Sequence, residues 1–180
     1  MKANKANSRK QIRLSKYDYS QSGYYFVTVC TNNRECMFGN IVDGKMKLNE
    51  YGKIAKKEWL KTSKLRKNVK LDIYQIMPNH IHGIIIIVGA GLSRPQSGSS
   101  RPTLGQIVAY FKYQSTKQIN DIINGSENPT PTGEYVIKKT FQRNYYEHVI
   151  RNEQSLNEIR EYIKNNPKNW ETDRNNPKNV

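Results

Sequence analysis

Hydrophobic residues in this chain alternate between short β-branched runs and segments with helical spacing. The runs are rich in Val, Ile, Tyr and Thr, which favour extended structure. Strands are predicted for residues 24–31, 69–76 and 80–88, with a further short one at 135–137. Apolar residues three and four apart predict amphipathic helices for residues 51–65, 104–123 and 153–165.

Capping and turn residues mark the ends of these elements. Asn49, Thr103 and Asn152 each stand where a side-chain oxygen can cap a following helix. Pro167 stops the last helix, because the residue before a proline is pushed out of helical geometry. Asp43-Gly44, between two short apolar runs, is a strong signal for a hairpin.

The element order before the last helix is strand, helix, strand, strand, helix, strand. This order predicts an α+β fold, with a ferredoxin-like antiparallel sheet covered on one face by two helices. Such a fold proves no activity, since binding modules and enzymes share it. With 180 residues, we expect a flexible basic arm at 1–17, a single domain at 18–170 and a polar tail at 171–180.

Charge and composition narrow the class of partner. The chain has 30 Lys and Arg residues against 15 Asp and Glu, a formal net charge of +15, and its 12 tyrosines could stack on unpaired bases. Nucleic acid is favoured over a membrane surface or no polyanion at all. Two cysteines and the lack of an apolar leader or spanning segment predict a cytoplasmic protein without disulfides or membrane contact. The basic residues of the arm are Lys2, Lys5, Arg9, Lys10, Arg13 and Lys16.

Two of the three histidines stand at the entrance of a predicted strand. Side chains alternate along a strand, so His80 and His82 project from one face and Ile81 from the other. Two adjacent imidazoles can hold one metal ion. The alternative is a hydrogen-bonded pair at a sheet edge.

A tyrosine and an amide on the last helix are the second candidate group. Tyr162 and Asn166 lie one helical turn apart and could share a face. Imidazole and amide ligands suit Mn²⁺ or Mg²⁺, and a tyrosine can be a nucleophile if its phenol is activated. Tyr162 could equally be a boundary residue of the core. His148 is an accessory candidate, as proton shuttle or phosphate contact, or simply a surface histidine. Rival nucleophiles on the same reasoning are Tyr110, Tyr113, Tyr145 and Tyr146.

Three ordered motifs resemble those of a known family. The segments 77–82 (MPNHIH), 141–152 (FQRNYYEHVIRN) and 161–167 (EYIKNNP) are similar to those of the IS200-like, REP-associated tyrosine transposases, which are HUH single-strand DNA endonucleases. The resemblance implies that His80 and His82 hold a divalent metal, Mg²⁺ or Mn²⁺, and that Tyr162 is the nucleophile. It also implies that Asn166 completes the metal site, where related insertion-sequence enzymes have glutamine.

The resemblance further implies a reaction and a partner. Tyr162 would cleave single-stranded DNA by transesterification, forming a 5′-phosphotyrosine that a strand transfer can reverse. The DNA would carry a hairpin held by the basic arm and Arg143, and the protein would act as a monomer or homodimer. The alternatives are a non-catalytic ferredoxin-like module that binds nucleic acid, and a metal-dependent hydrolase that uses water.

Overall fold

The computed structural model describes residues 17–89, 102–125 and 137–179. Most predicted strands and all three predicted helices are confirmed, with ends that differ by one or two residues. The elements are β1 (Gly23–Cys30), β2 (Gly39–Val42), β3 (Lys45–Leu48), α1 (Glu50–Lys64), β4 (Val69–Ile76), β5 (His80–Ile87), α2 (Leu104–Gly125), β6 (Tyr146–Ile150) and α3 (Glu153–Asn165).

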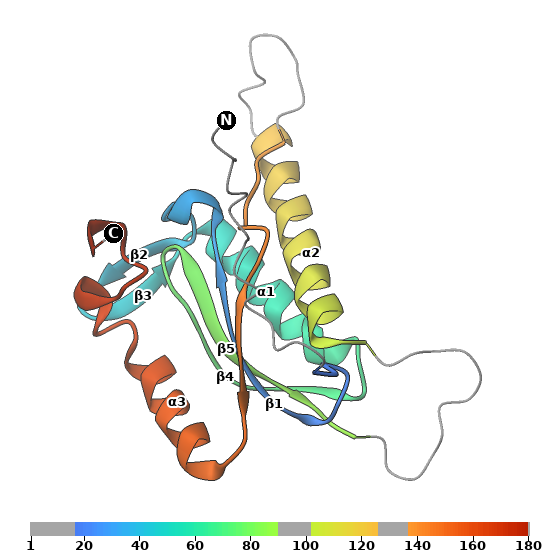
Figure 1. Ribbon diagram of the computed structural model, residues 1–180. Helices are drawn as coiled ribbons and strands as arrows, with labels where there is room; N and C mark the ends of the chain where they lie inside the picture. The colour runs from blue at the N-terminus through green and yellow to red at the C-terminus, as the bar shows by residue number, and fades with distance from the viewer. Residues whose placement is uncertain (1–16, 90–101, 126–136, 180) are drawn as a thin grey trace, which may run out of the picture.

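Four strands form one antiparallel sheet in the order β4-β5-β1-β6 (Figure 1). This is the strand order of a ferredoxin-like fold, so the predicted fold class is confirmed. The central strands β1 and β5 pair along their whole length, from Gly23 opposite Ile87 to Cys30 opposite His80. The strand that begins at His80, β5, is therefore paired on both sides, with β4 and with β1.

Helices α1 and α2 cover one face of the sheet (Figure 1). The Asn49 side chain caps α1 by accepting from the Gly52 amide, as predicted. Trp59 on α1 packs against β5 where Gly83 leaves room for its indole, because a Cβ on Gly83 would lie 2.4 Å from Trp59 Cζ2. The core on this face buries β1 and β5 residues with helix residues, including Tyr25, Val27, Val29, Ile81, Ile85, Trp59 and Phe111.

Helix α3 covers the opposite face (Figure 1). Asn152 caps it by accepting from the Ser155 amide. Its apolar residues Leu156 and Ile163 pack on a smaller core formed by Phe26, Ile84 and Ile150. The alternation along β5 therefore points His80 and His82 toward the α3 side and Ile81 toward α1 and α2.

The strands β2 and β3 form the predicted accessory hairpin. Asp43 and Gly44 both have positive φ, at 50° and 66°, as the favoured two-residue hairpin turn requires. Met46 and Leu48 pack from this hairpin onto the edge of the larger core.

The prediction of a strand at 135–137 is wrong for Ile137, the one of these three residues that the structure describes. Ile137 belongs to no strand and is 79% exposed. The fourth strand is instead β6, whose register on β1 runs from Thr28 opposite Tyr146 to Tyr24 opposite Ile150. The sequence does not predict β6, because its polar residues Glu147 and His148 mask the alternation of an edge strand.

Several predictions fall outside the described residues. These are the basic arm up to Lys16 and residues 135 and 136 of the short predicted strand. Among the residues that the structure describes, no helix is long and apolar enough to cross a membrane.

Candidate active site

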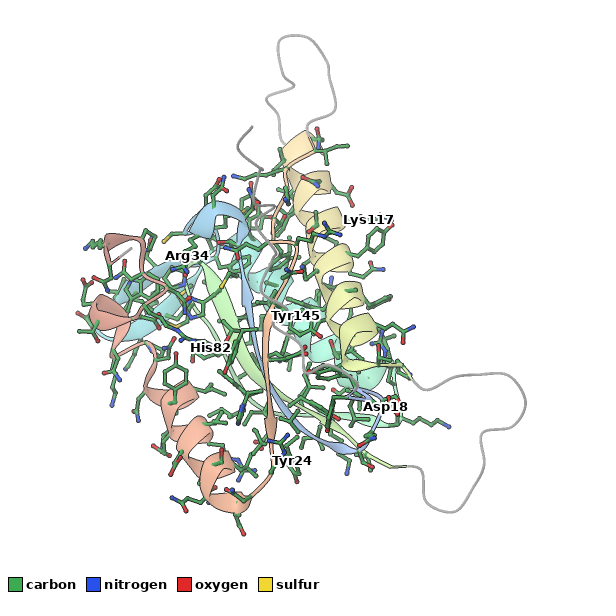
Figure 2. All side chains as sticks on the ribbon, viewed as in Figure 1. Asp18, Tyr24, Arg34, His82, Lys117 and Tyr145 are labelled. Carbon is green, nitrogen blue, oxygen red and sulfur yellow. The ribbon has the colours of Figure 1, made fainter. Side chains whose placement is uncertain are left out.

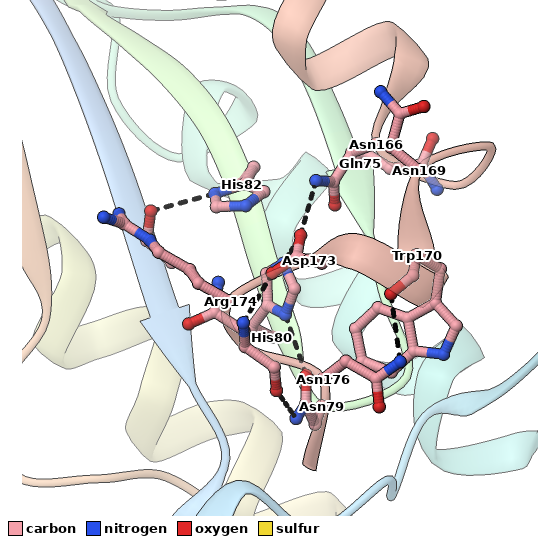
Figure 3. Close-up of polar contacts among 12 residues, drawn as sticks. Gln75, Asn79, His80, His82, Asn166, Asn169, Trp170, Asp173, Arg174 and Asn176 are labelled. Carbon is pink, nitrogen blue, oxygen red and sulfur yellow. Dashed lines mark hydrogen bonds and ion pairs between the residues drawn. The ribbon is translucent and has the colours of Figure 1, made fainter. Parts of the chain in front are cut away.

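His82 lies between the sheet and α3 (Figure 2), and His80 lies beside it (Figure 3). Their ring centroids are 4.4 Å apart, and both side chains are fully buried. The prediction that they share one face of the strand is confirmed. Phe26 stacks on His82, with ring centroids 5.4 Å apart, and limits the movement of that imidazole.

Neighbouring side chains set the orientation of both imidazoles. The Asn79 amide donates to the carbonyls of Arg34 and Asn175, so its Oδ1 is left to face His80 Nδ1 at 2.8 Å. Since Oδ1 can only accept, His80 Nδ1 carries the proton and Nε2 keeps its lone pair. His82 Nδ1 lies 2.8 Å from the Thr28 hydroxyl, which can donate or accept, so this contact orients the ring without fixing its tautomer. Both Nε2 atoms are thereby directed into the site.

Helix α3 brings Tyr162 to the histidines. The Tyr162 hydroxyl lies 3.1 Å from His82 Nε2, and its ring stands edge-on to Phe26 at 6.2 Å. The Tyr162 side chain remains 42% exposed, which keeps the hydroxyl open to a ligand. Tyr146 lies on the neighbouring edge strand, whereas Tyr110 and Tyr113 belong to α2 on the other face. The Tyr162 hydroxyl contacts His82, Tyr146 lines the same cavity as Tyr162, and Tyr110 and Tyr113 are not among the walls of that cavity.

The end of the chain completes the site, which the sequence analysis missed. Residues 170–179 fold over His80, and Asp173 becomes buried with its Oδ2 4.0 Å from His80 Nε2 (Figure 3). Asn166 caps the end of α3 and donates to Asp173 Oδ2 at 2.7 Å. The backbone N–H of Asn175 donates to Asp173 Oδ1 at 2.6 Å. A tryptophan and two acidic residues, Glu171 and Asp173, between two Asn-Asn-Pro segments were the available signals in the sequence.

Burial controls protonation of the site. It lowers the pKa of His80 to about 4, although the Asp173 carboxylate opposes that shift. Burial, with the neighbouring His80, also lowers the pKa of His82 well below its ordinary value. Both imidazoles are therefore neutral at physiological pH. Burial raises the pKa of the Tyr162 phenol, and the Asp173 carboxylate raises it further.

These donor atoms fit a divalent cation. The ligand atoms of His80, His82 and Asp173 all lie within 4.8 Å of one another. His80 Nε2 and Asn166 Oδ1 are buried and have no hydrogen-bond partner among the described residues. A lone pair on a neutral imidazole facing a carboxylate is unfavourable unless a positive charge lies between them. Two imidazoles with a carboxylate and an amide oxygen form a mixed nitrogen and oxygen donor set of the kind that binds divalent cations.

A cavity of about 500 Å³ opens beside the Tyr162 hydroxyl. Its walls are Phe26, Tyr146, Tyr162, Asn166, Asn169, Thr172, Asp173 and Arg174. His148 shares the sheet face of Tyr146 but is exposed and forms no wall of this cavity. Arg143 is also exposed and away from these walls, and the basic residues from Lys2 to Lys16 lie outside the described residues.

Comparisons with known proteins place this fold in a class. No protein-family model matches the chain. The solved structure of a REP-associated tyrosine transposase bound to a REP hairpin aligns with a TM-score of 0.58 and 18% identity, over 88% of this chain and 73% of that one. A Deinococcus radiodurans structure described as a candidate transposase aligns over 85% of this chain and 95% of that one, with 16% identity and a TM-score of 0.45. The chain thus has the fold of the REP-associated tyrosine transposase.

A closer relative is found in sequence. A Haemophilus influenzae protein, described as uncharacterized, is 40% identical over 177 residues, which cover 92% of this chain and 91% of that protein. The chain belongs to the same family as this Haemophilus protein.

Proposed function

We propose that this protein is a metal-dependent, single-strand DNA endonuclease and strand transferase that uses Tyr162 as its nucleophile. The observation that carries the proposal is the 3.1 Å approach of the Tyr162 hydroxyl to His82 Nε2, beside the donor atoms of His80 and Asp173. A partly exposed phenol at a buried cluster of metal-ligand type is arranged for attack on a phosphate. The fold shared with a transposase that binds a REP hairpin supports this reaction class.

The proposed step is a transesterification. The Tyr162 oxygen forms a bond to phosphorus, the bond from phosphorus to the 3′ oxygen breaks, and a 5′-phosphotyrosine and a free 3′ hydroxyl result. The phenol loses one proton and the departing oxygen gains one, so water is not consumed. Because the covalent link keeps the phosphodiester bond energy, a free 3′ hydroxyl can reverse the step and join strands.

The residues that would hold the metal are His80, His82 and Asp173, with Asn166 as the predicted amide ligand. A bound divalent cation would supply Lewis-acid charge for the phosphate oxygens and for the phenol. Asn79 and Thr28 would keep the imidazoles in place, as second-layer partners do at other metal sites. Phe26 would shield this cluster from water on the β1 side.

The proposed substrate is hairpin-containing DNA with an unpaired strand at Tyr162. The net charge of +15 favours a polyanion, and the basic arm with Arg143 remains predicted to hold the phosphate backbone. Tyr162 and both histidines of one chain meet in the structure. A single copy therefore suffices for the proposed site.

A covalent adduct tests this proposal directly. Purified protein is incubated with Mn²⁺ or Mg²⁺ and a single-stranded oligonucleotide that has an imperfect hairpin between unpaired flanks. A label on the 3′ end is expected to migrate with the protein on a denaturing gel, because the nucleophile retains the 3′ fragment. A label on the 5′ end is expected to appear in a shorter oligonucleotide that a polymerase can extend.

The control separates Tyr162 from the other tyrosines. Tyr162→Phe is expected to abolish the adduct, whereas Tyr113→Phe, at an exposed tyrosine of α2, is expected to retain it. An adduct that survives Tyr162→Phe would exclude this nucleophile. Cleavage without an adduct would instead indicate a hydrolase that uses water, and binding without cleavage a non-catalytic module.

A further inference from the structure

A second cavity, of about 390 Å³, adjoins the Tyr162 cavity. The two cavities share Tyr146 and Arg174 as walls. A strand that places a phosphate at Tyr162 therefore has a neighbouring recess within reach. The remaining walls are Thr28, Cys30, Arg34, Gln142, Asn144, Tyr145 and Asn175.

Asn175 presents an unused donor at this recess. The residue is only 6% exposed, and its Nδ2 has no hydrogen-bond partner among the described residues. Its Oδ1 accepts from the Cys30 thiol at 4.0 Å, which leaves the NH₂ end of the amide for a ligand. A buried amide donor without a partner is unfavourable, and a ligand acceptor would satisfy it.

The main chain of Asn175 is bound separately from its side chain. Its amide donates to Asp173, and its carbonyl accepts from Asn79. The side chain can therefore be altered while the contacts that position Asp173 and His80 are kept.

The other walls supply cations and aromatic surface. The Arg174 guanidinium lies 5.9 Å from the centre of the Tyr146 ring, and Arg34 donates to the Arg174 carbonyl at 2.9 Å. Tyr146 is 43% exposed, so its ring has area left for stacking. In the view of Figure 2, Arg34 and His82 lie to the left of α2, the helix that carries Lys117. Aromatic rings beside arginines are typical of sites that hold unpaired bases.

We propose that this second cavity binds one unpaired nucleobase of the DNA strand next to the phosphate attacked by Tyr162. The inference rests on the proposed function and adds a specificity pocket to it. Tyr146 stacks on the base, and Asn175 Nδ2 donates to its edge. Because Asn175, Arg34 and Arg174 all present donors, the pocket favours the keto bases guanine and thymine. On the edge where guanine and thymine carry the O6 and O4 acceptors, adenine and cytosine carry the N6 and N4 amino donors.

A selection experiment tests the base preference without cleavage. The full chain is mixed, in EDTA, with a single-stranded library that has eight randomised nucleotides beside a fixed hairpin, and the bound DNA is sequenced. The wild type is expected to select guanine or thymine at one randomised position. Asn175→Ala is expected to lose the preference at that position alone, and Asn40→Ala, at an exposed asparagine of β2, is expected to keep it.

Affinity measurements make the assignment quantitative. An abasic nucleotide at the selected position is expected to weaken wild-type binding about tenfold, as the loss of one good base contact does. Asn175→Ala is expected to discriminate less than the wild type between the intact and abasic strands, because only the stacking on Tyr146 remains. Asn175→Asp, which keeps the size of the side chain, should turn the preference toward the amino bases because an acceptor replaces the donor.

The outcomes separate this inference from the proposed function. A preference that survives in both Asn175 variants, or a wild-type preference for adenine or cytosine, would overturn the nucleobase pocket. If the wild type forms the Tyr162 adduct but no position depends on Asn175, only the pocket is wrong. If the wild type binds no single-stranded DNA, the proposed function and the pocket fail together.

Discussion

At the scale of single residues, the site depends on polar groups that orient one another. Asn79 sets which nitrogen of His80 carries the proton, because both hydrogens of its own amide are bound to carbonyls. The Asn166 side chain and the backbone N–H of Asn175 each donate a hydrogen bond to one carboxylate oxygen of Asp173. The donor atoms are thus arranged before a metal arrives, which lowers the cost of binding it.

Asp173 is the first residue to test. Asp173→Asn keeps the size of the side chain but removes the negative charge that faces His80, so Mn²⁺ affinity is expected to fall roughly tenfold or more. Isothermal titration or the electron paramagnetic resonance signal of free Mn²⁺ measures the change. Asp121→Asn, at an exposed position on α2, is the matched control and should bind Mn²⁺ as the wild type does. If both variants bind Mn²⁺ with equal affinity, Asp173 is not a ligand of the metal.

At the scale of elements, the position of Tyr162 depends on how α3 is fixed to the sheet. The helix packs on a small apolar cluster and is tied to β4 by Arg160, which donates twice to Asp72 Oδ2, at 2.6 and 3.0 Å. Asp72 lies at an irregularity between Leu71 and Tyr74 in the pairing of β4 with β5. This local distortion gives the carboxylate its position opposite α3.

Arg160→Gln is expected to loosen α3 without unfolding the protein. The ion pair is partly exposed, so its loss should cost no more than about 1 kcal/mol of unfolding free energy. The rate of adduct formation is expected to fall several-fold with little change in DNA affinity, since Tyr162 would be less well placed. Hydrogen exchange at the α3 amides should accelerate while that of β5 stays slow.

The control for this prediction lies on the same helix. Within the described part of the chain, Lys164 pairs with Glu161, one turn away in α3, so Lys164→Gln should leave both the adduct rate and hydrogen exchange unchanged. A normal adduct rate in Arg160→Gln would show that the apolar cluster alone positions the helix.

At the scale of the whole molecule, the buried histidines link stability to pH. Because the folded-state pKa of His80 is about 4, below the ordinary value of 6.5, the unfolded chain takes up a proton between those values that the folded chain does not. The contribution of His80 to the unfolding free energy of the metal-free protein is therefore fully present above about pH 6.5 and is lost as the pH falls toward 4. The slope per histidine approaches roughly 1 kcal/mol per pH unit.

Urea unfolding in EDTA at pH 7 and pH 5 measures this loss. His80→Gln is expected to reduce the difference between the two pH values, whereas His148→Gln, at an exposed histidine, leaves it unchanged. Added Mn²⁺ should raise the unfolding free energy at pH 7, because it binds the folded state. An unchanged pH dependence in His80→Gln would contradict the assignment.

The sequence by itself determined the elements that periodicity and capping control. Alternation placed His80 and His82 on one strand face, and Asn49, Asn152 and Asp43-Gly44 marked ends and turns that the structure has. These features depend on a few neighbouring residues, so local rules sufficed. The helical spacing of Tyr162 and Asn166 was likewise local.

Only the tertiary structure decided what meets the histidines. Tyr162 is separated from His82 by 80 residues, and Asp173 entered the site because the polar end of the chain folds over His80. No local pattern reports such a contact, since a polar segment is buried only when its amides find partners elsewhere. The same reason explains β6, whose pairing with β1 rather than its own composition makes it a strand.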